Sequence, residues 1–198
     1  MVRSIASRTV ESSQDLEEFS SHFVGRLSAL ARTQSALARR GIEGVELEDL
    51  VREELVSHTA REGEQVEIAG PRVRLKEKAA EVFTLALHEL ATNAVKYGAL
   101  ASGKGMITVG WRVMNTSDGR RLSLEWRESG VPLLDATPRH RGFGRDLLER
   151  GLPYDLGAQT GLEFAPGGVR CTVEVPLSAR VIEVLEADIE QLEYEDNA

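Results

Sequence analysis

The chain has 198 residues, a single cysteine and a formal net charge of −8. The length suits one compact domain with an appendage, and one cysteine excludes a disulfide framework. No apolar run approaches the ~20 residues of a membrane span, and the N-terminal residues lack the apolar region of a signal peptide. Residues 179–198 carry seven acids and one arginine, so the rest is nearly neutral. These features argue against a nucleic-acid-binding surface and favour a cytoplasmic protein.

The N-terminal part of the chain shows helical periodicity. Residues 1–11 predict a helix, and residues 15–40 predict a second one from apolar side chains recurring at three- and four-residue steps, ended by Gly41. A shorter amphipathic helix is predicted at 45–59. The first two helices should form a hairpin. Because its apolar stripe is long and narrow, we expect a second copy of the hairpin to complete a dimeric bundle.

Strands dominate the rest of the chain. The predicted elements are strands at 66–69, 73–75, 106–114, 122–128, 159–165 and 169–177, and helices at 76–97, 145–151 and 179–193. This order predicts an α+β fold in three parts. They are a helical hairpin (1–44), a sandwich whose mixed, mostly antiparallel sheet has helices on one face (45–178), and an acidic C-terminal helix or tail (179–198). Cys171 alternates with apolar positions and is expected to be a buried strand residue.

The helix at 76–97 contains the string ALHELATNAVKY, which suggests chemistry. Its residues Glu89, Asn93 and Lys96 fall at i, i+4 and i+7, so they share one face. An asparagine oxygen can bind a hard cation, a lysine can attract phosphate, and a glutamate can polarise a proton in transfer. On spacing alone, the same stripe also fits an ordinary solvated helix face. His88 and Tyr97 flank the stripe.

Three further segments favour a nucleotide site. Trp126-Arg127-Glu128-Ser129-Gly130 ends a strand with a carboxylate that can accept a hydrogen bond from the exocyclic amine of adenine. Gly142-Phe143-Gly144 precedes a helix, where backbone N–H groups can bind an anion. The loop at 133–141 contains the basic cluster Arg139-His140-Arg141. Taken individually, the three segments also fit an exposed strand end, a turn and a solvated loop. Taken together, they favour a nucleotide site, and the loop is then a candidate lid over the nucleotide.

In this order, the segments closely resemble the HWE family of bacterial sensor histidine kinases, within the GHKL ATPase superfamily. The resemblance covers about residues 2–177. The residues that give the family its name correspond to His88 and to Trp126-Arg127-Glu128. The strings LALHELATNAVKYGAL at 85–100 and GFGRDLLERGLP at 142–153 are nearly diagnostic.

The resemblance implies a Bergerat-type fold that binds ATP and Mg²⁺. Asn93 would hold Mg²⁺, and Glu89 would act near the transferred phosphoryl group as a polarising base. The other implied contacts to nucleotide are those of Lys96, Tyr97, Glu128, Gly130, Gly142, Phe143 and Gly144. His88 and Trp126 mark the family, and we expect His88 to pack or to orient a neighbour through a hydrogen bond.

The chain also departs from the family pattern. In the family, a histidine upstream of the first helix accepts the phosphoryl group, and none of His22, His58, His88 and His140 stands in that context. Either the chain is cut from a longer protein or the protein lacks its own acceptor. Gln34-Ser35 and Val131 replace the family's usual His-Asp and second glycine, and Val131 would be strained at positive φ.

The sequence therefore predicts the catalytic core of a two-component sensor histidine kinase, dimeric and paired with a response regulator. One alternative is a dimeric scaffold or phosphotransfer-type regulator that docks a response regulator without phosphorylating itself. Another is a kinase of the same superfamily directed at serine or threonine. For this chain alone, we expect no autophosphorylation on histidine.

Overall fold

The computed structural model describes residues 2–57, 65–101, 105–131, 142–165 and 167–183. Within them the helical segments are α1 (Val2–Ser12), α2 (Leu16–Arg40), the 3₁₀ turn Gly41–Glu43, α3 (Leu47–Ser57), α4 (Glu77–Lys96), α5 (Phe143–Asp146), the π-helical turn Leu147–Gly151 and α6 (Leu152–Leu156). The strands are β1 (Val45–Glu46), β2 (Val66–Ala69), β3 (Val73–Leu75), β4 (Met106–Thr116), β5 (Gly119–Ser129), β6 (Gln159–Ala165), β7 (Gly168–Pro176) and β8 (Val181–Glu183).

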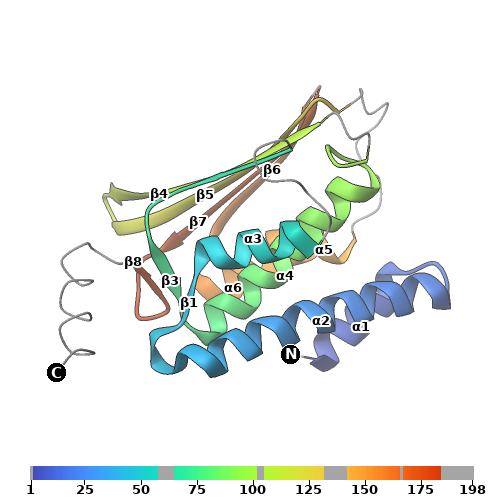
Figure 1. Ribbon diagram of the computed structural model, residues 1–198, viewed down its shortest axis with the longest axis horizontal. Helices are drawn as coiled ribbons and strands as arrows, with labels where there is room; N and C mark the ends of the chain where they lie inside the picture. Colours follow the sequence, from blue (N-terminus) through green and yellow to red (C-terminus); the bar gives the residue numbers. More distant parts are fainter. Residues whose placement is uncertain (1, 58–64, 102–104, 132–141, 166, 184–198) are drawn as a thin grey trace.

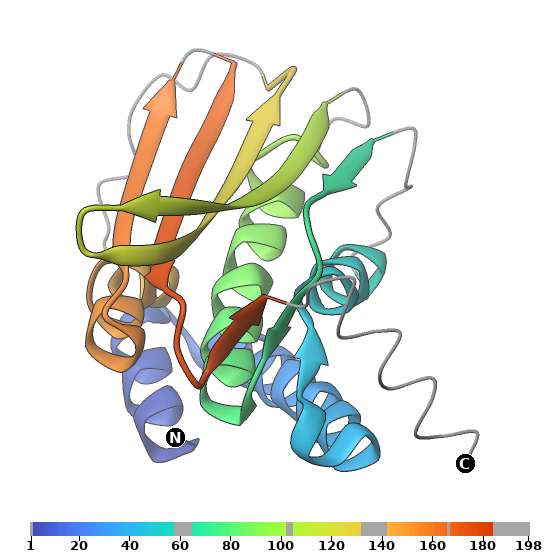
Figure 2. The same ribbon diagram turned by 90° about the vertical axis from the view of Figure 1, so that its left-hand side faces the viewer.

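The elements form layers (Figures 1 and 2). A five-stranded sheet in the order β2-β4-β5-β7-β6 covers the middle layer of helices α3, α4, α5 and α6. Its β2–β4 pair is parallel, and its other pairs are antiparallel. The hairpin α1–α2 lies on the opposite side of that helical layer. This arrangement confirms the predicted α+β class with a mixed, mostly antiparallel sheet and helices on one face.

Alternation along β5 explains how the sheet faces its helices. Leu122, Leu124 and Trp126 are at most 1% exposed, whereas the residues between them point to the open face. Glu128 continues the buried series, although it carries a carboxylate. Cys171 pairs with Trp126 across β5 and β7. It is fully buried, and this burial raises the pKa of its thiol to about 12.

Helix α4 is the centre of the fold. Most of its side chains between Ala79 and Ala94 are buried, because neighbouring elements surround the helix. The sheet covers one side of α4, and α2, α3, α5 and α6 contact the rest. Any functional residue on α4 is therefore either covered by a neighbouring element or confined to its C-terminal end.

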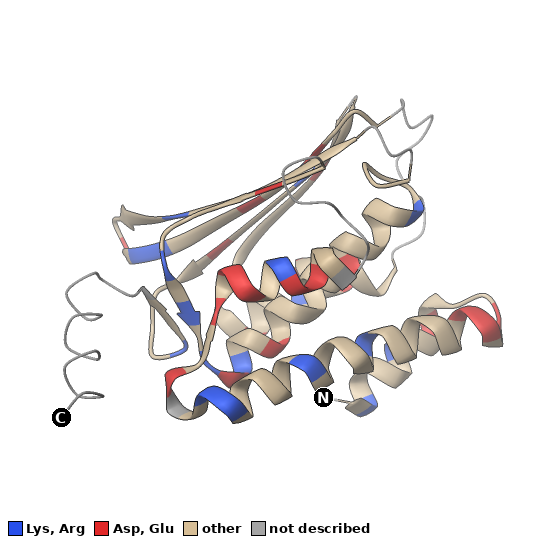
Figure 3. Cartoon of the chain, in the orientation of Figure 1, with Lys and Arg blue, Asp and Glu red and all other residues tan. Residues whose placement is uncertain are grey.

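Helix α2 is built as the sequence predicts at both ends. Asp15 accepts a hydrogen bond from the Glu18 N–H at the N-terminus, and the N–H of Gly41 bonds the Leu37 carbonyl at the C-terminus. Figure 3 shows acidic residues in its first turn and basic residues in its last turn, which matches the helix dipole. No described helix is both long and apolar enough to cross a membrane.

The N-terminal boundary of the third predicted helix is wrong. Val45 and Glu46 form strand β1, which pairs antiparallel with Leu75 and Arg74 of β3. Helix α3 begins only at Leu47. The sequence prediction missed this change because a two-residue strand is too short to show its own periodicity.

The helix predicted at 179–193 is wrong where the structure describes it. Val181–Glu183 form β8, which pairs with β3 and completes a small antiparallel sheet in the order β1-β3-β8. β-Branched Val181 and Ile182 suit a strand, and three residues cannot distinguish helical from strand periodicity. The rest of that prediction, residues 184–193, lies outside the described residues.

The short helix predicted at 145–151 is longer in the structure. It begins at Phe143, passes through a π-helical turn and continues to Leu156. The domain boundaries at 44 and 178 remain predictions, although β8 extends the packed fold beyond residue 178.

The strand β8 can be tested by paired substitutions. Val181 is 2% exposed and Ile182 is 36% exposed, whereas a helix would place Ile182 on the apolar face. We expect Val181→Ala to lower the free energy of unfolding by about 2 kcal/mol, and Ile182→Ala by less than about 1 kcal/mol. Urea unfolding of both variants measures the difference. A larger loss for Ile182→Ala would contradict the strand.

Candidate functional site

The predicted stripe on α4 is divided by burial. Glu89 is 9% exposed, whereas Asn93 and Lys96 are exposed and Tyr97 is 64% exposed. An exposed amide and an exposed ammonium at the C-terminal end of α4 are accessible to an anionic ligand with its cation. Glu89, one turn earlier, is covered by other elements of the chain. The four residues are thus neighbours on α4 in different environments.

The covering residue of Glu89 is Arg26, from the middle of α2. The Nε of Arg26 donates to Glu89 Oε1 at 2.7 Å, and Nη2 donates to Oε2 at 3.1 Å. The third bond of this guanidinium, from Nη1, goes to Thr9 Oγ1 of α1 at 2.6 Å. Its Cζ atom lies 3.9 Å from the ring centroid of Phe143. Arg26 is only 3% exposed, so this is a buried ion pair with a bidentate geometry.

Sequence reasoning missed Arg26. The residue stands between Phe23 and Leu30 at three- and four-residue steps, which are core positions of α2. Arginine is almost never fully buried unless it is paired, so an arginine at such a position signals a buried anionic partner. That signal was present in the sequence, but the partner, Glu89, is 63 residues away.

The segment Gly142-Phe143-Gly144 lies against the same carboxylate. A Cβ atom on Gly144 would stand 2.9 Å from Glu89 Cβ and 3.1 Å from its Oε2. Glycine at 144 therefore allows α5 to approach α4 closely. The structure brings this glycine segment, Glu89 and Arg26 together, as the sequence predicts for the first two.

Trp126 and Glu128 lie on the inner face of β5, where they form a unit. The indole Nε1 of Trp126 donates to Glu128 Oε1 at 3.2 Å, and the backbone N–H of Ala99 donates to Oε2 at 2.8 Å. A Cβ on Gly98 would meet Glu128 Oε2 at 2.0 Å. The carboxylate therefore joins the end of β5 to the segment just after α4, beside the exposed end of the α4 stripe.

Burial controls the ionisation of Glu128. Desolvation raises the pKa of its carboxyl group, and the hydrogen bonds from Ala99 and Trp126 offset this only partly. A carboxylate with two donors keeps further lone pairs for a ligand amine. Glu128 is thus a buried carboxyl group with two fixed donors and remaining acceptor capacity.

His88 faces away from this carboxylate and towards α3. Its Nδ1 lies 3.0 Å from Glu54 Oε2, and Arg32 of α2 donates to the other oxygen of Glu54. Burial raises the pKa of Glu54, but the interactions with His88 and Arg32 outweigh it and lower the pKa overall. On the α2 side, a Cβ atom added to Gly25 would lie 3.0 Å from Nε2 of this imidazole. His88 joins three helices, in agreement with the expected packing and hydrogen-bonding role.

A second residue of α2 contacts the stripe. The Nζ of Lys96 lies 2.6 Å from Nε2 of His22, four residues before Arg26. Desolvation lowers the pKa of His22, and the charges of Lys96 and Arg26 lower it further. The imidazole is therefore neutral near pH 7 and can accept a hydrogen bond from the lysine.

The residues at the two departures from the family pattern make ordinary contacts in the structure. Gln34 is exposed and donates to Glu81 of α4 at 2.7 Å. The positive φ in the Gly130-Val131 pair belongs to Gly130, at 73°. Val131 is buried, and its N–H donates to the Gly167 carbonyl at 3.0 Å. The predicted lid loop 133–141, with Arg139-His140-Arg141, lies outside the described residues.

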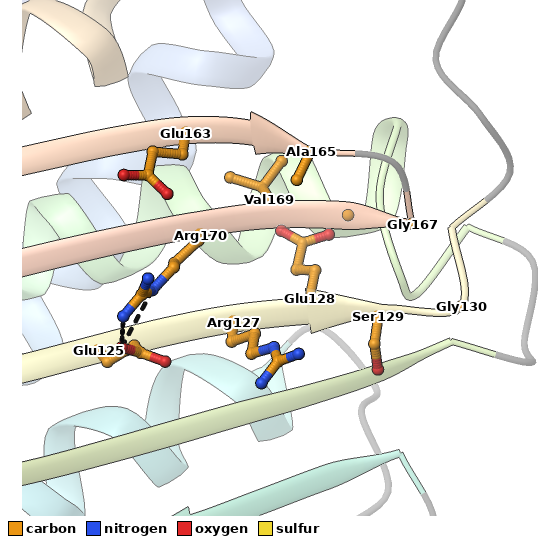
Figure 4. A pocket seen from close by; sticks show the side chains of 11 residues that line it. Glu125, Arg127, Glu128, Ser129, Gly130, Glu163, Ala165, Gly167, Val169 and Arg170 are labelled. Atoms are coloured by element: carbon orange, nitrogen blue, oxygen red, sulfur yellow. Dashed lines mark hydrogen bonds and ion pairs between the residues drawn. The ribbon is translucent and has the colours of Figure 1, made fainter.

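A depression of about 470 Å³ lies near the end of the large sheet. Figure 4 shows the side chains that line it. Glu125 of β5 pairs with Arg170 of β7 across its floor, at 2.6 Å. These residues alternate with the buried ones, so the depression is on the face away from the helices. Its lining includes Glu128 and Gly130 of the predicted site but no residue of the α4 stripe. We therefore assign the candidate site to the inner side.

No group of three or more histidine, cysteine, aspartate or glutamate side chains is suited to hold a metal among the described residues. A cation bound here would rely on an asparagine oxygen and on ligand phosphates, which is the usual manner of Mg²⁺. Asn93 fits that donor set because its amide is exposed beside Lys96.

Comparison with known proteins agrees with this geometry. A family model described as HWE histidine kinase matches residues 1–72. The chain is 32% identical over 181 residues to a blue-light-activated histidine kinase of Brucella ovis, covering 91% of this chain and 37% of that protein. It is also 32% identical over 187 residues to the Brucella anthropi protein of the same name, covering 94% of this chain and 38% of that one.

Solved structures show the same fold. The blue-light activated histidine kinase of Erythrobacter litoralis EL346 matches with a TM-score of 0.61 at 17% identity, over 89% of this chain and 57% of that one. Its histidine kinase domain matches with a TM-score of 0.60 at 16% identity, over 90% and 95%. The chain is thus similar to the HWE histidine kinase family over residues 1–72, and to the Brucella histidine kinases over most of its own length. It spans little more than a third, 37%, of the Brucella ovis relative.

The raised pKa of Glu128 predicts a pH-dependent stability difference. Because the fold favours the neutral acid, wild type is most stable relative to Glu128→Gln below the ordinary glutamate pKa of 4.5. That advantage is lost as the pH rises through the raised pKa of the folded protein. Urea unfolding of both proteins from pH 4 upward measures it. A difference that stays constant, or that grows in favour of wild type, contradicts the assignment.

Proposed function

We propose that the chain is the catalytic core of a sensor histidine kinase, which binds ATP with Mg²⁺ and transfers the γ-phosphoryl group to a histidine. The observation that supports this best is the junction of α4 and β5. There, Glu128 is positioned beside the exposed end of the stripe that carries Asn93 and Lys96. The similarity to histidine kinases supports the reaction.

In this proposal, each residue has a limited task. Glu128 accepts a hydrogen bond from the adenine amine, and its fixed partners, Trp126 and Ala99, keep it in position. Asn93 supplies an oxygen ligand to Mg²⁺, which neutralises phosphate charge when bound. Lys96 and Tyr97 face phosphate or ribose, and Gly144 lets the following helix approach.

Glu89 has the task that depends most on its environment. As a free carboxylate near the phosphoryl group, it can polarise the attacking nucleophile. In phosphoryl transfer, positioning and charge provide most of the catalysis, so the orientation of Glu89 matters more than its basicity. The absence of a side chain at Gly144 leaves room for this carboxylate, because a Cβ there would lie 3.1 Å from its Oε2.

The proposed partners are a second copy of the chain and the receiver domain of a response regulator. The support for a dimer lies on the outer face of α2. Val24, Ala31 and Ala38 are exposed at seven-residue spacing, which is the spacing of a helix–helix seam. ATP and receiver domains are cytoplasmic, so the proposal includes a cytoplasmic location.

Nucleotide binding tests the central claim. We expect calorimetry to show ATP–Mg²⁺ binding with a dissociation constant below about 1 mM. Asn93→Ala should weaken it at least about tenfold, because it removes a cation ligand. Asn115→Ala is the matched control, since Asn115 is exposed on β4 away from α4. No binding by wild type at millimolar ATP would refute the kinase and leave the scaffold alternative.

The seam on α2 predicts the effect of charge on assembly. Ala31→Glu should dissociate the dimer, because it places a carboxylate at the centre of the seam in each copy. Val56→Glu on α3, where the valine is 66% exposed, should leave the dimer intact. Light scattering over a range of concentrations measures both. A wild-type chain that stays monomeric at high concentration counts against the proposed dimer.

A further inference from the structure

Arg26 links the hairpin to three parts of the candidate site at once. From α2 it reaches Glu89 on α4, Thr9 on α1 and the ring of Phe143 in the glycine segment. Thr9 is itself fixed, because its hydroxyl donates to the Ile5 carbonyl at 2.6 Å. All of these contacts are buried, so a movement of the hairpin away from α4 would break them together.

The pairing also determines what Glu89 can do. Both of its oxygens accept hydrogen bonds from Arg26, and its charge is neutralised by the guanidinium. The charge that would attract a cation is already balanced by the guanidinium, and Glu89 is only 9% exposed beneath the hairpin. Glu89 therefore has two alternative partners, which are Arg26 and a bound Mg-nucleotide.

His22 adds to the same effect. One turn before Arg26, it contacts Lys96 at 2.6 Å. Two of the residues proposed to meet nucleotide, Glu89 and Lys96, thus contact neighbouring turns of a single helix, although Lys96 stays exposed. Asn93, between them on α4, remains exposed.

We propose that Arg26 is a positioning residue that withholds Glu89 from the nucleotide while the hairpin is docked. Docking of α2 and binding of Mg-nucleotide then compete for one carboxylate. This inference rests on the proposed function, because it assumes that the α4 stripe binds nucleotide. It adds that the hairpin sets the affinity of the site.

The competition must be reciprocal. If nucleotide draws Glu89 away from Arg26, it weakens the docking of α1 and α2, and docking weakens nucleotide binding by the same factor. Loss of Arg26 should therefore strengthen nucleotide binding. A residue that only stabilised the fold would give the opposite sign, since its loss would weaken binding or leave it unchanged.

Affinity for ADP–Mg²⁺ tests this sign without turnover. By calorimetry on the full chain, Arg26→Met should bind ADP–Mg²⁺ at least about fivefold more tightly than wild type. Arg26→Lys keeps the charge but loses the two-pronged geometry, so its affinity should be intermediate. Arg40→Met is the matched control, because Arg40 ends the same helix in an exposed pair with Asp49. It should bind as wild type does.

Hydrogen exchange of the wild-type chain provides a measurement that needs no variant. ADP–Mg²⁺ should speed amide exchange in α1 and in the middle of α2, because the hairpin loosens when Glu89 is taken. In Arg26→Met, exchange there should already be fast, since an unpaired buried carboxylate disfavours docking.

The outcomes are distinguishable. Failure of wild type to bind ADP–Mg²⁺ would refute the proposed function, and the inference with it. Binding by wild type with equal or weaker affinity in Arg26→Met would overturn the inference and leave the function standing. If Arg26→Met does not fold, unchanged or slower exchange in the wild-type hairpin on adding ADP–Mg²⁺ would overturn it alone.

Discussion

The buried pair of Arg26 and Glu89 is the constraint on which the arrangement of the helical layers depends. Two charges removed from water are costly unless each keeps its hydrogen bonds. Here the guanidinium donates twice to the carboxylate and once to Thr9, and its face lies on Phe143. Satisfying these groups requires α1, α2, α4 and α5 to meet at one point. The position of the hairpin is therefore specified by polar geometry as well as by apolar contact.

Around this pair, the other polar contacts divide into two kinds. Glu54 and His88 connect helices to helices and hold α3 against α2 and α4. Glu128 and Trp126 connect the sheet to the end of α4. The first group fixes the framework, and the second holds in place the carboxylate that we propose to contact nucleotide. The two halves of the family's HWE signature thus belong to different parts of the molecule, with separate physical tasks.

The sequence allowed much of the framework to be predicted. The bounds of α2, α4, β2 and β3 follow from capping, glycine and periodicity, all of which act over a few residues. Failures occurred where pairing at a distance decides the structure, as in β1 and β8, which become strands because β3 lies between them. Local patterns carry no information about such partners.

The candidate site shows the same division. The stripe on α4 and the glycine segment were recognisable from spacing, and the closeness of Gly144 to Glu89 agrees with that interpretation. The partner of Glu89 was not recognisable, because nothing near residue 89 indicates an arginine from the hairpin. The burial that separates Glu89 from Asn93 is likewise a tertiary property, since both occupy equivalent positions on the helix surface.

Gly25 gives the hairpin a selective fit. Glycine within a helix costs about 1 kcal/mol relative to alanine. At this position, it leaves room for the imidazole of His88, which a Cβ would approach to 3.0 Å. A larger residue at position 25 would have to displace the ring and strain its bond to Glu54. The packing of α2 on α4 thus depends on a position that carries no side chain.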